Sequence, residues 1–559
     1  MGDASTLSRR SVVKRPESTN SSRREVLRGI TRMAGGLGLA LAAPPLVRAA
    51  AAQAMNPMPR MAGMERAGVR HGMPFVRPLP IPPQLSGEPQ PDGSRLYNLR
   101  MAPGRTSLIA QRRTPTWGYN GSYLGPTLRV PRATQVRINI LNDIDQSTTT
   151  HWHGAHVRGS MDGGPHSLFQ PGARFPYAFR LEQPAATLWY HPHPETRTGA
   201  HVFAGLAGLL LVDDESNVPP DLPSAYGVDD LPLIVQDRAL APDGTLAYMT
   251  RAMDRMGMKG DRILVNGREQ PFVEVPAQWV RLRLLDASNA RIYYFGFDDG
   301  REFHVIASDA GLLPRAVPVR RLLLAPGERA EVVVDLSRDQ GRSLALRSYS
   351  EEIVPSLSMM RMDSDALDRS TFDVLQLRVA EPSGRRTRLP PQLVPIEPLR
   401  SELPVRTFTL QAAAQAIMAA PARAAAGLHR PTSPPGPGGM SLGIGGQKWL
   451  SIDHEYMDMG RIDAAVRLGS TEIWQFENRS HMPHPMHYHG VSFQIVSIDG
   501  NPPAPEVAGW KDTVLVRRGA TVRTIARFEQ PASREHPFML HCHILEHEDN
   551  GMMLQFTVA

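Results

Sequence analysis

The residues of this chain with the clearest capacity for chemistry are histidines that occur in pairs separated by one position. Four such His-X-His pairs occur among 19 histidines in 559 residues, whereas chance placement would give fewer than one. On a β-strand, residues i and i+2 point to the same face, so each pair presents two imidazoles side by side. Clustered imidazoles suit copper, zinc, iron or nickel. The pairs are His151/His153, His191/His193, His487/His489 and His541/His543.

The single cysteine narrows the choice of metal. In the sequence HCH around Cys542, the thiolate points away from the two flanking imidazoles, and by the same alternation His484 lies opposite the histidine pair that follows it. His547 and Met552 come five and ten residues after Cys542. One cysteine, two histidines and a weak axial methionine are the ligands of a blue copper electron-transfer centre. We therefore predict a copper ion bound by His484, Cys542, His547 and Met552.

The eight paired histidines come half from the first part of the chain and half from the last. Eight imidazoles can hold three copper ions at an interface between two domains. Because Cys542 is flanked by two of these histidines, an electron that enters the blue site can reach such a cluster along the backbone. Four one-electron centres can together supply the four electrons that convert dioxygen to water without releasing peroxide.

The elements that must position these residues have the pattern of an all-β protein. From residue 80 onward, short runs alternate apolar and polar residues and are separated by Pro-Gly and Asp-Gly turns. A strand–turn–strand segment recurs three times, at 128–143, 272–288 and 464–480. A second segment relates 179–193 to 526–543, and the middle unit has Pro326-Gly327 and a strand at 330–336 in its place, without histidine pairs.

These repeats predict three related β-sandwich domains, at 75–217, 225–385 and 400–559, of which the middle one is a metal-free spacer. The alternative is one large irregular sandwich with chance internal similarity. Within the third unit, an insertion at 412–446 is rich in Ala, Pro and Gly and predicts a short helix with a flexible flap.

The first 49 residues have the composition of an export signal. Ser22-Arg23-Arg24 precedes an apolar run at 33–43 and a small-residue site at 47–49, which predicts a twin-arginine signal peptide over 1–49. A disordered basic tail is the alternative. The twin-arginine export machinery carries folded proteins, so we expect a periplasmic or secreted protein, with a flexible, Met-containing arm at 50–74.

Charge and hydropathy exclude other classes of partner. The formal charge of +7 is concentrated in the leader, because residues 1–49 hold nine Arg and Lys against three Asp and Glu. The rest of the chain is close to neutral, so we expect no nucleic-acid partner. No uncharged apolar stretch reaches 18 residues, so we expect no stable membrane insertion. One cysteine also excludes a disulfide scaffold.

Four motifs together resemble the signature of the multicopper oxidases, and the chain is similar to the laccase-like and cuprous oxidases of bacteria. They are HWHG at His151, WYHPH at Trp189, HPMHYHG at His484 and HCHILEHEDNGMM at His541, and the match covers nearly the whole mature chain. The resemblance implies three tandem cupredoxin-like Greek-key domains, four copper ions as cofactors and dioxygen as electron acceptor. We expect a monomer.

Carried over residue by residue, the resemblance assigns His484, Cys542, His547 and Met552 to one type 1 copper, His151 and His487 to one type 2 copper, and His153, His191, His193, His489, His541 and His543 to two type 3 coppers. Asp162 and Glu548 match acidic residues that the family places near this cluster. Because reducing dioxygen to water consumes protons, both are candidate proton donors. Each can alternatively be an ordinary turn or surface carboxylate.

The electron donor is the open question. Relatives that oxidise Cu(I) cover the type 1 copper with a Met-rich helix and loop, but here the segment 410–427 is mostly alanine and keeps only Met418. At about the positions where a Cu(I) site would need one Met and two Asp, this chain has Ala412, Ile417 and Ser480. Met482 is retained. This departure favours a laccase-like oxidase of phenols and aromatic amines.

Two other functions compete with the laccase-like one. The first is a periplasmic cuprous oxidase in copper homeostasis, which would use Met359, Met360, Met362 or the arm at 50–74 in place of the missing helix. The second is a periplasmic scaffold or division protein that keeps only the fold. Met249, Met253, Met256 and Met258 form a further group, which fits either thioether copper ligands or the apolar face of a helix.

Overall fold

The structure is a computed structural model that describes residues 68–559 except 71, 215, 217, 358–365, 386 and 413–447. The predicted signal peptide, most of the Met-containing arm, the insertion after Ala412 and the Met359–Met362 group lie outside the described residues. The described residues belong to one compact unit.

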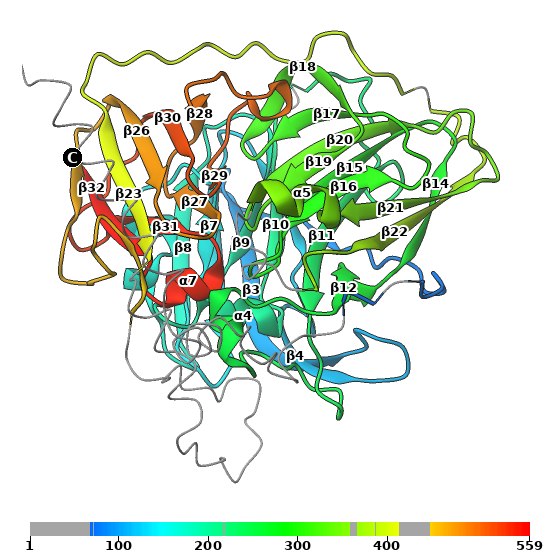
Figure 1. Ribbon diagram of the computed structural model, residues 1–559, viewed down its shortest axis with the longest axis horizontal. Coiled ribbons are helices and arrows are strands. Elements are labelled where there is room, and N and C mark those ends of the chain that lie inside the picture. The colour runs from blue at the N-terminus through cyan, green and yellow to red at the C-terminus, as the bar shows by residue number, and fades with distance from the viewer. Residues whose placement is uncertain are drawn as a thin grey trace, which may run out of the picture. The chain divides into compact units, whose positions relative to one another are not determined.

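Six β-sheets hold most of the regular secondary structure of the described chain, two in each third of it, which fits three cupredoxin β-sandwiches (Figure 1). We call them the first, middle and third sandwich. The all-β prediction is therefore confirmed. Each sheet combines antiparallel pairs with at least one parallel pair, as where β5 (Thr127–Pro131) runs parallel to β10 (Gly208–Asp213).

The first sandwich has the strand order β1 (Gln84–Leu85), β5, β10, β9 (Ala186–His191), β7 (His151–His153) in one sheet and β2 (Glu88–Pro89), β3 (Arg95–Thr106), β6 (Gln135–Asn142), β8 (Arg174–Arg180) in the other, where β4 (Thr114–Tyr119) also pairs with β3. The middle sandwich has β13 (Arg268–Glu269), β12 (Arg262–Val265), β11 (Asp230–Arg238), β15 (Trp279–Asp286), β20 (Arg329–Asp335), β17 (Phe303–Ser308), β18 (Gly311–Val319) and, in its second sheet, β14 (Phe272–Pro276), β22 (Thr371–Ala380), β21 (Ser343–Tyr349), β16 (Tyr293–Phe297), β19 (Leu322–Leu324). The third sandwich has β24 (Leu450–Ile452), β23 (Arg406–Ala412), β26 (Thr471–Asn478), β30 (Thr521–Arg527), β28 (Phe493–Ile498) and, in its second sheet, β25 (Ala464–Val466), β32 (Met553–Val558), β31 (Phe538–Cys542), β27 (His484–Tyr488), β29 (Thr513–Val516).

Short helices lie between strands: α3 (Gly159–Asp162), η1 (Pro165–Ser167), α4 (Thr198–Ala204), η2 (Ala252–Met256), α5 (Ser350–Leu357), η3 (Pro505–Val507) and α7 (Leu545–Asp549).

The internal repeats fold as the sequence predicts. The three copies of the strand–turn–strand segment become β5 and β6, β14 and β15, and β25 and β26. Buried and less buried residues alternate along β6 and β26, as expected where one face of a strand meets the core. The equivalent of the second repeat in the middle sandwich is β20 after the Pro326-Gly327 turn.

Three large apolar clusters form the cores, one in each sandwich. A smaller cluster joins Trp189 and Leu209 of the first sandwich to Ile234 and Leu285 of the middle one. This contact explains why β11 is buried along its whole length instead of alternating. The first and middle sandwiches therefore share an apolar interface.

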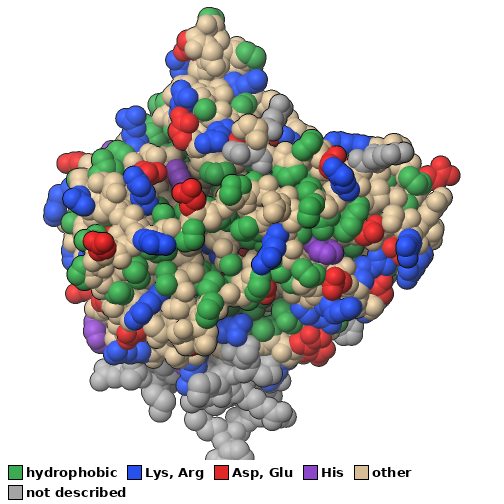
Figure 2. All heavy atoms as spheres, turned by 90° about the horizontal axis from the view of Figure 1, so that it is seen from above, with side chains coloured by type: hydrophobic (Ala, Val, Ile, Leu, Met, Phe, Trp, Pro, Cys, Tyr) green, Lys and Arg blue, Asp and Glu red, His purple; other side chains and the backbone are tan. Residues whose placement is uncertain are grey.

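None of the helices in the described part of the chain is long and apolar enough to cross a membrane. On the face that Figure 2 presents, acidic and basic side chains are interspersed.

Candidate metal centre

Strand register brings the four histidine pairs together. β7 pairs antiparallel with β9 so that His151 lies opposite His191, and β27 pairs with β31 so that His487 lies opposite His541. All eight paired histidines are buried. Because β7 and β9 belong to the first sandwich and β27 and β31 to the third, the eight imidazoles meet between these two sandwiches.

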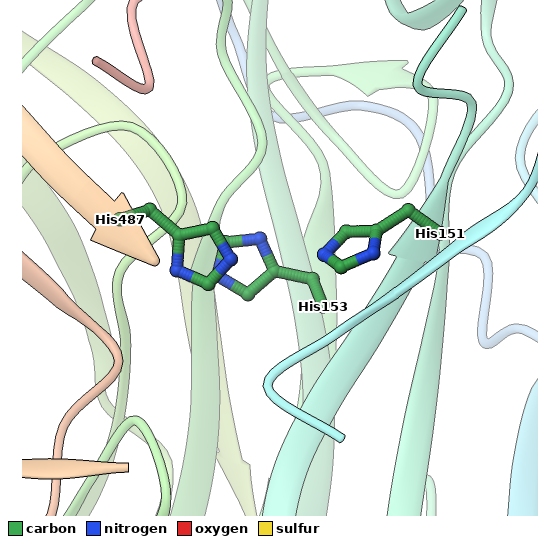
Figure 3. Close-up of side chains that lie close together, drawn as sticks. All are labelled: His151, His153 and His487. Atoms are coloured by element: carbon green, nitrogen blue, oxygen red, sulfur yellow. The ribbon is translucent and has the colours of Figure 1, made fainter. Parts of the chain in front are cut away.

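The paired histidines form three triplets. Within each triplet, one ring nitrogen from every histidine lies within 4.8 Å of the other two. We call these eight residues the eight-histidine group. Figure 3 shows one triplet, in which the rings of His153 and His487 stack with their centroids 3.8 Å apart and His151 faces them. The triplets are His151, His153 and His487; His153, His191 and His543; and His193, His489 and His541.

The spacing of the ring nitrogens fits metal ions. The Nε2 atom of His541 lies 3.3 Å from Nε2 of His193 and 3.2 Å from Nε2 of His489. Two nitrogens that bind one metal ion tetrahedrally at about 2.0 Å lie about 3.3 Å apart. Several other buried ring nitrogens have no hydrogen-bond partner in the described structure, namely Nε2 of His151, His191, His487 and His543, and Nδ1 of His153.

Burial also favours the neutral state in several of these imidazoles, which is the state that metal binding needs. Desolvation lowers the pKa of His193 to about 4, and it lowers the pKa of His153 and His191 well below the usual value. A neutral imidazole keeps a lone pair for a metal ion. An unpartnered buried polar nitrogen is costly unless something binds it, so the group is suited to receive metal.

Cys542 and two histidines form a second site on the other side of the strands. The Sγ atom of Cys542 lies 3.3 Å from Nδ1 of His484 and 3.5 Å from Nδ1 of His547, and all three residues are buried. Met552 is buried in the same apolar cluster as Cys542, and its carbonyl accepts the Cys542 N–H. We call these four residues the Cys542 group. Burial raises the pKa of the Cys542 thiol, as expected for a thiol held without a cation beside it.

The outer nitrogens of the two histidines in the Cys542 group already have partners. Nε2 of His484 lies 2.7 Å from the Ser480 hydroxyl, and Nε2 of His547 donates to the carbonyl of Met256 at 3.3 Å. These contacts leave both Nδ1 atoms to face Cys542. The sequence could not predict these two contacts. The Ser480 hydroxyl and the Met256 backbone carbonyl belong to no motif that would pair them with a histidine.

The two predicted acidic residues both lie against the eight-histidine group. The Oδ2 atom of Asp162 accepts a hydrogen bond from Nδ1 of His489 at 2.7 Å. The carboxylate oxygens of Glu548 lie 3.3 Å from Nδ1 of His193 and 3.2 Å from Nδ1 of His541. Burial alone would raise the pKa of the Glu548 carboxyl, but His193 and His541 outweigh it and lower the pKa to about 2.

One acidic residue at this site escaped the sequence analysis. Asp512 is buried beside the eight-histidine group, and its Oδ1 atom accepts from Nε2 of His153 at 3.1 Å. Its carbonyl oxygen accepts from Nδ1 of His487 at 2.7 Å. Asp512 is far from both histidines in the sequence and belongs to none of the motifs, so only the fold reveals its position.

Two methionines of the middle-sandwich group, Met258 and Met249, pack in one apolar cluster. Ala252–Met256 forms the 3₁₀-helix η2, and Met249 lies outside it. Met258 is fully buried against Phe203 and Tyr248, which is an ordinary apolar environment. The helical interpretation therefore holds over only part of the segment, because the helix ends at Met256 and is followed by Gly257, whose φ is +126°.

Comparison with known proteins agrees with this geometry. Two family models described as multicopper oxidase match residues 101–217 and 430–559. Multicopper oxidase mco of Staphylococcus haemolyticus is 32% identical over 474 residues, which cover 84% of this chain and 89% of that protein. Cell division protein FtsP of Xenorhabdus nematophila is 36% identical over 482 residues, which cover 86% and 92%.

A solved structure of a multicopper oxidase is also similar to this chain. The laccase-like multicopper oxidase CueO of Ochrobactrum sp. matches with a TM-score of 0.73 and 33% identity, over 86% of this chain and 100% of that one. The Cys542 group and the eight-histidine group fit the type 1 and trinuclear copper sites of such proteins. The chain belongs to the multicopper oxidase family.

Proposed function

We propose that this protein is a laccase-like oxidase, which takes single electrons from phenolic or aromatic donors and reduces dioxygen to water. The observation that carries the proposal is the completeness of both donor sets. Every predicted histidine ligand and Cys542 lie within one of the compact groups. A relative that keeps only the fold has no need of so many unpartnered buried imidazole nitrogens.

In this proposal, the chain holds four copper ions. The Cys542 group holds a type 1 copper, His151 and His487 hold a type 2 copper, and the two remaining triplets hold the type 3 pair. When bound, copper supplies the one-electron transfers that link the donor to dioxygen. The chain connects the two sites through the peptide bonds that join Cys542 to its neighbours His541 and His543.

Asp162 and Glu548 are the proposed proton carriers. The Oδ1 atom of Asp162 and both carboxylate oxygens of Glu548 are buried without a hydrogen bond of good geometry in the described structure. The Asp162 carboxylate can therefore take up a proton and deliver it beside the eight-histidine group, whereas Glu548, which its low pKa keeps ionised, would relay a proton there only transiently. Nδ1 of His489 donates a hydrogen bond to Asp162, and Nδ1 of His193 and of His541 lie 3.3 and 3.2 Å from the carboxylate of Glu548.

Support for an organic donor comes from the sequence and from one relative. The Ochrobactrum protein is described as having oxidase activity towards lignin model compounds and lignosulfonate. The test is the initial rate of oxygen uptake by the copper-loaded mature protein with a methoxyphenol and with Cu(I) at matched concentration. Faster uptake with the phenol supports the laccase-like function, and much faster uptake with Cu(I) contradicts it.

A cuprous oxidase is the second candidate, because the retained methionine Met482 lies two residues before His484 and is 8% exposed. Thioethers are soft ligands that suit Cu(I). If this candidate is right, Met482→Leu lowers the rate with Cu(I) and leaves the rate with the phenol unchanged.

A division protein is the third candidate, since one relative carries that name. A protein that stays colourless and binds no copper after copper loading would support it against both oxidases. For all three candidates we propose export by the twin-arginine route to the periplasm. Replacing Arg23 and Arg24 with Lys should keep the precursor in the cytoplasm, which fractionation and immunoblotting would show.

A further inference from the structure

Arg329, on β20 of the middle sandwich, reaches the edge of the eight-histidine group. It is fully buried, and its guanidinium contacts the carboxylate of Asp512 at two points, Nη1 to Oδ1 at 2.7 Å and Nη2 to Oδ2 at 2.5 Å. Such paired contacts fix the plane of a carboxylate as well as its position. The middle sandwich is therefore in contact with the site although it supplies no predicted copper ligand.

Every N–H of the Arg329 guanidinium has an acceptor, and the acceptors come from all three sandwiches. The remaining three donors are taken by the carbonyls of Thr187 on β9, of Gly327, and of Asp309. A buried guanidinium with all five donors matched has one orientation. Asp512 raises the pKa of Arg329 against the effect of burial, so the cation persists.

Asp512 transmits this orientation to two histidines. Its Oδ1 atom accepts from Nε2 of His153, which leaves Nδ1 of His153 without a hydrogen bond and facing the rest of the group. Its carbonyl oxygen accepts from Nδ1 of His487. The partner of one ring nitrogen decides which nitrogen remains for a metal ion. His153 and His487 are the two stacked rings of Figure 3.

Close packing supports the same arrangement. A Cβ atom at Gly154 would lie 2.4 Å from Oδ2 of Asp512 and 2.8 Å from Nη2 of Arg329. The last residue of the HWHG motif must therefore be glycine to admit the ion pair. Lys511 adds a second cation beside Asp309, with Nζ 2.9 Å from its carboxylate, and so stabilises the loop that carries Asp512.

We propose that Arg329 is a positioning residue for the eight-histidine group, which acts through Asp512 to fix the tautomer and orientation of His153 and the placement of His487. The simpler alternative is that Arg329 only joins the sandwiches. Without the guanidinium, the Asp512 carboxylate loses two hydrogen bonds and can turn away from His153. The proposal rests on the proposed copper function for its copper measurements, whereas the tautomer can be measured without copper.

The test compares Arg329→Lys with the matched control Arg283→Lys in the full-length protein. Arg283 is also a buried arginine of the middle sandwich, and it contacts an aspartate, Asp230, at two points. Its other hydrogen bonds within the described residues go to Glu331 and Thr187. The control therefore perturbs a similar buried arginine. Its ion pair with Asp230 lies within the middle sandwich, its hydrogen bond to Thr187 reaches the first sandwich, and none of these partners is a histidine of the group.

Three measurements decide the outcome. In copper-free protein, ¹⁵N NMR of the imidazoles should show that Arg329→Lys loses the single Nε2–H tautomer of His153. In copper-loaded protein, the variant should keep the blue absorption of the Cys542 group while its remaining copper is held about 10- to 100-fold more weakly. Arg283→Lys should change neither.

A wild-type tautomer and wild-type copper retention in Arg329→Lys would overturn the proposal. Loss of blue absorption in parallel with the other copper would do the same, because it would indicate general unfolding. Arg329→Gln is the second variant. If neither variant folds while Arg283→Lys does, the role is structural and the proposal is wrong. If wild-type protein binds no copper, the proposed function fails, and the tautomer measurement still decides the role of Arg329.

Discussion

Cys542 lies between two members of the eight-histidine group along the chain and between His484 and His547 in space. It is therefore the residue on which the proposed electron route depends. Cys542→Ser should abolish the intense thiolate-to-copper absorption and the oxidase turnover, because a hydroxyl is a poor copper ligand. Visible spectroscopy and oxygen uptake would check this. Retained turnover in a folded, colourless variant would contradict the route.

Asp162 permits a separate prediction about protons. Asp162→Asn keeps an oxygen that can accept from His489 but removes the group that can bind and release a proton. Turnover should fall by about a hundredfold, which is the low end for general acid catalysis, while copper content and colour stay unchanged. Metal analysis beside steady-state kinetics would show this. Turnover near the wild-type rate would return Asp162 to an ordinary structural role.

At the residue scale, the sequence could predict the ligands but not what holds them. The i, i+2 spacing of the histidine pairs and the opposite parity of Cys542 follow from strand geometry alone. Asp512, Ser480 and Met256 touch these ligands through contacts that depend on which strands become neighbours. The local sequence offers no reason to pair any of those three residues with a copper ligand.

The turn before β20 brings the middle sandwich into contact with His543 of the eight-histidine group. Gly327 has a φ of +87°, and a Cβ atom there would lie 2.9 Å from the ring of His543. Gly341 has a φ of +79° with nothing near its Cβ position, so it is a matched control. Alanine at either position should cost about 1 kcal/mol of stability through backbone strain. Only Gly327→Ala should also displace His543 and lower copper retention.

Denaturant unfolding and copper analysis of the two variants would separate strain from displacement. Equal copper retention in Gly327→Ala and Gly341→Ala would show that the middle sandwich does not constrain His543.

At the element scale, periodic segments were predicted well and irregular ones were not. The strand–turn–strand repeats were correct because their alternation and turn residues agree. The methionines at 249–258 have helical spacing, yet only Ala252–Met256 is helical and as a 3₁₀-helix. There the burial of Met258 and the conformation of Gly257 decide the path of the chain, and both depend on tertiary contacts.

At the scale of the whole molecule, a buried ionic network joins the first and middle sandwiches. Glu331 accepts hydrogen bonds from Thr187 of the first sandwich and from Arg281 and Arg283 of its own. Burial alone would raise the pKa of Glu331, but the two arginines outweigh it and lower the pKa from 4.5 to about 2. A depressed pKa stabilises the folded state above pH 4.5, and this contribution is lost as the pH falls towards 2.

Glu331→Gln should therefore lower the free energy of unfolding by about 3 kcal/mol near neutral pH. The difference from wild type should shrink as the pH falls from 4.5 to 2, because the wild-type carboxylate then becomes protonated too. Urea unfolding of copper-free protein at several pH values would measure it. A difference that does not change with pH would show that the charge of Glu331 contributes nothing to stability.

At this scale the sequence predicts the number of sandwiches but not the contacts between them. The internal repeat was enough to predict three related β-sandwiches, and the charge count was enough to locate the excess of positive charge in residues 1–49. The sequence described the middle unit only as a metal-free spacer. Arg329 and Gly327 show that this unit also contacts the residues around the site, through partners distant in the chain.

If the two donor sets work together as a copper oxidase, dioxygen is reduced completely to water. The ratio of electrons taken from the donor to dioxygen consumed by the copper-loaded protein tests this most directly, with peroxide measured in the same reaction. We expect about four electrons for each dioxygen and no peroxide. About two electrons with accumulating peroxide, or no oxygen uptake by a fully copper-loaded protein, would contradict it.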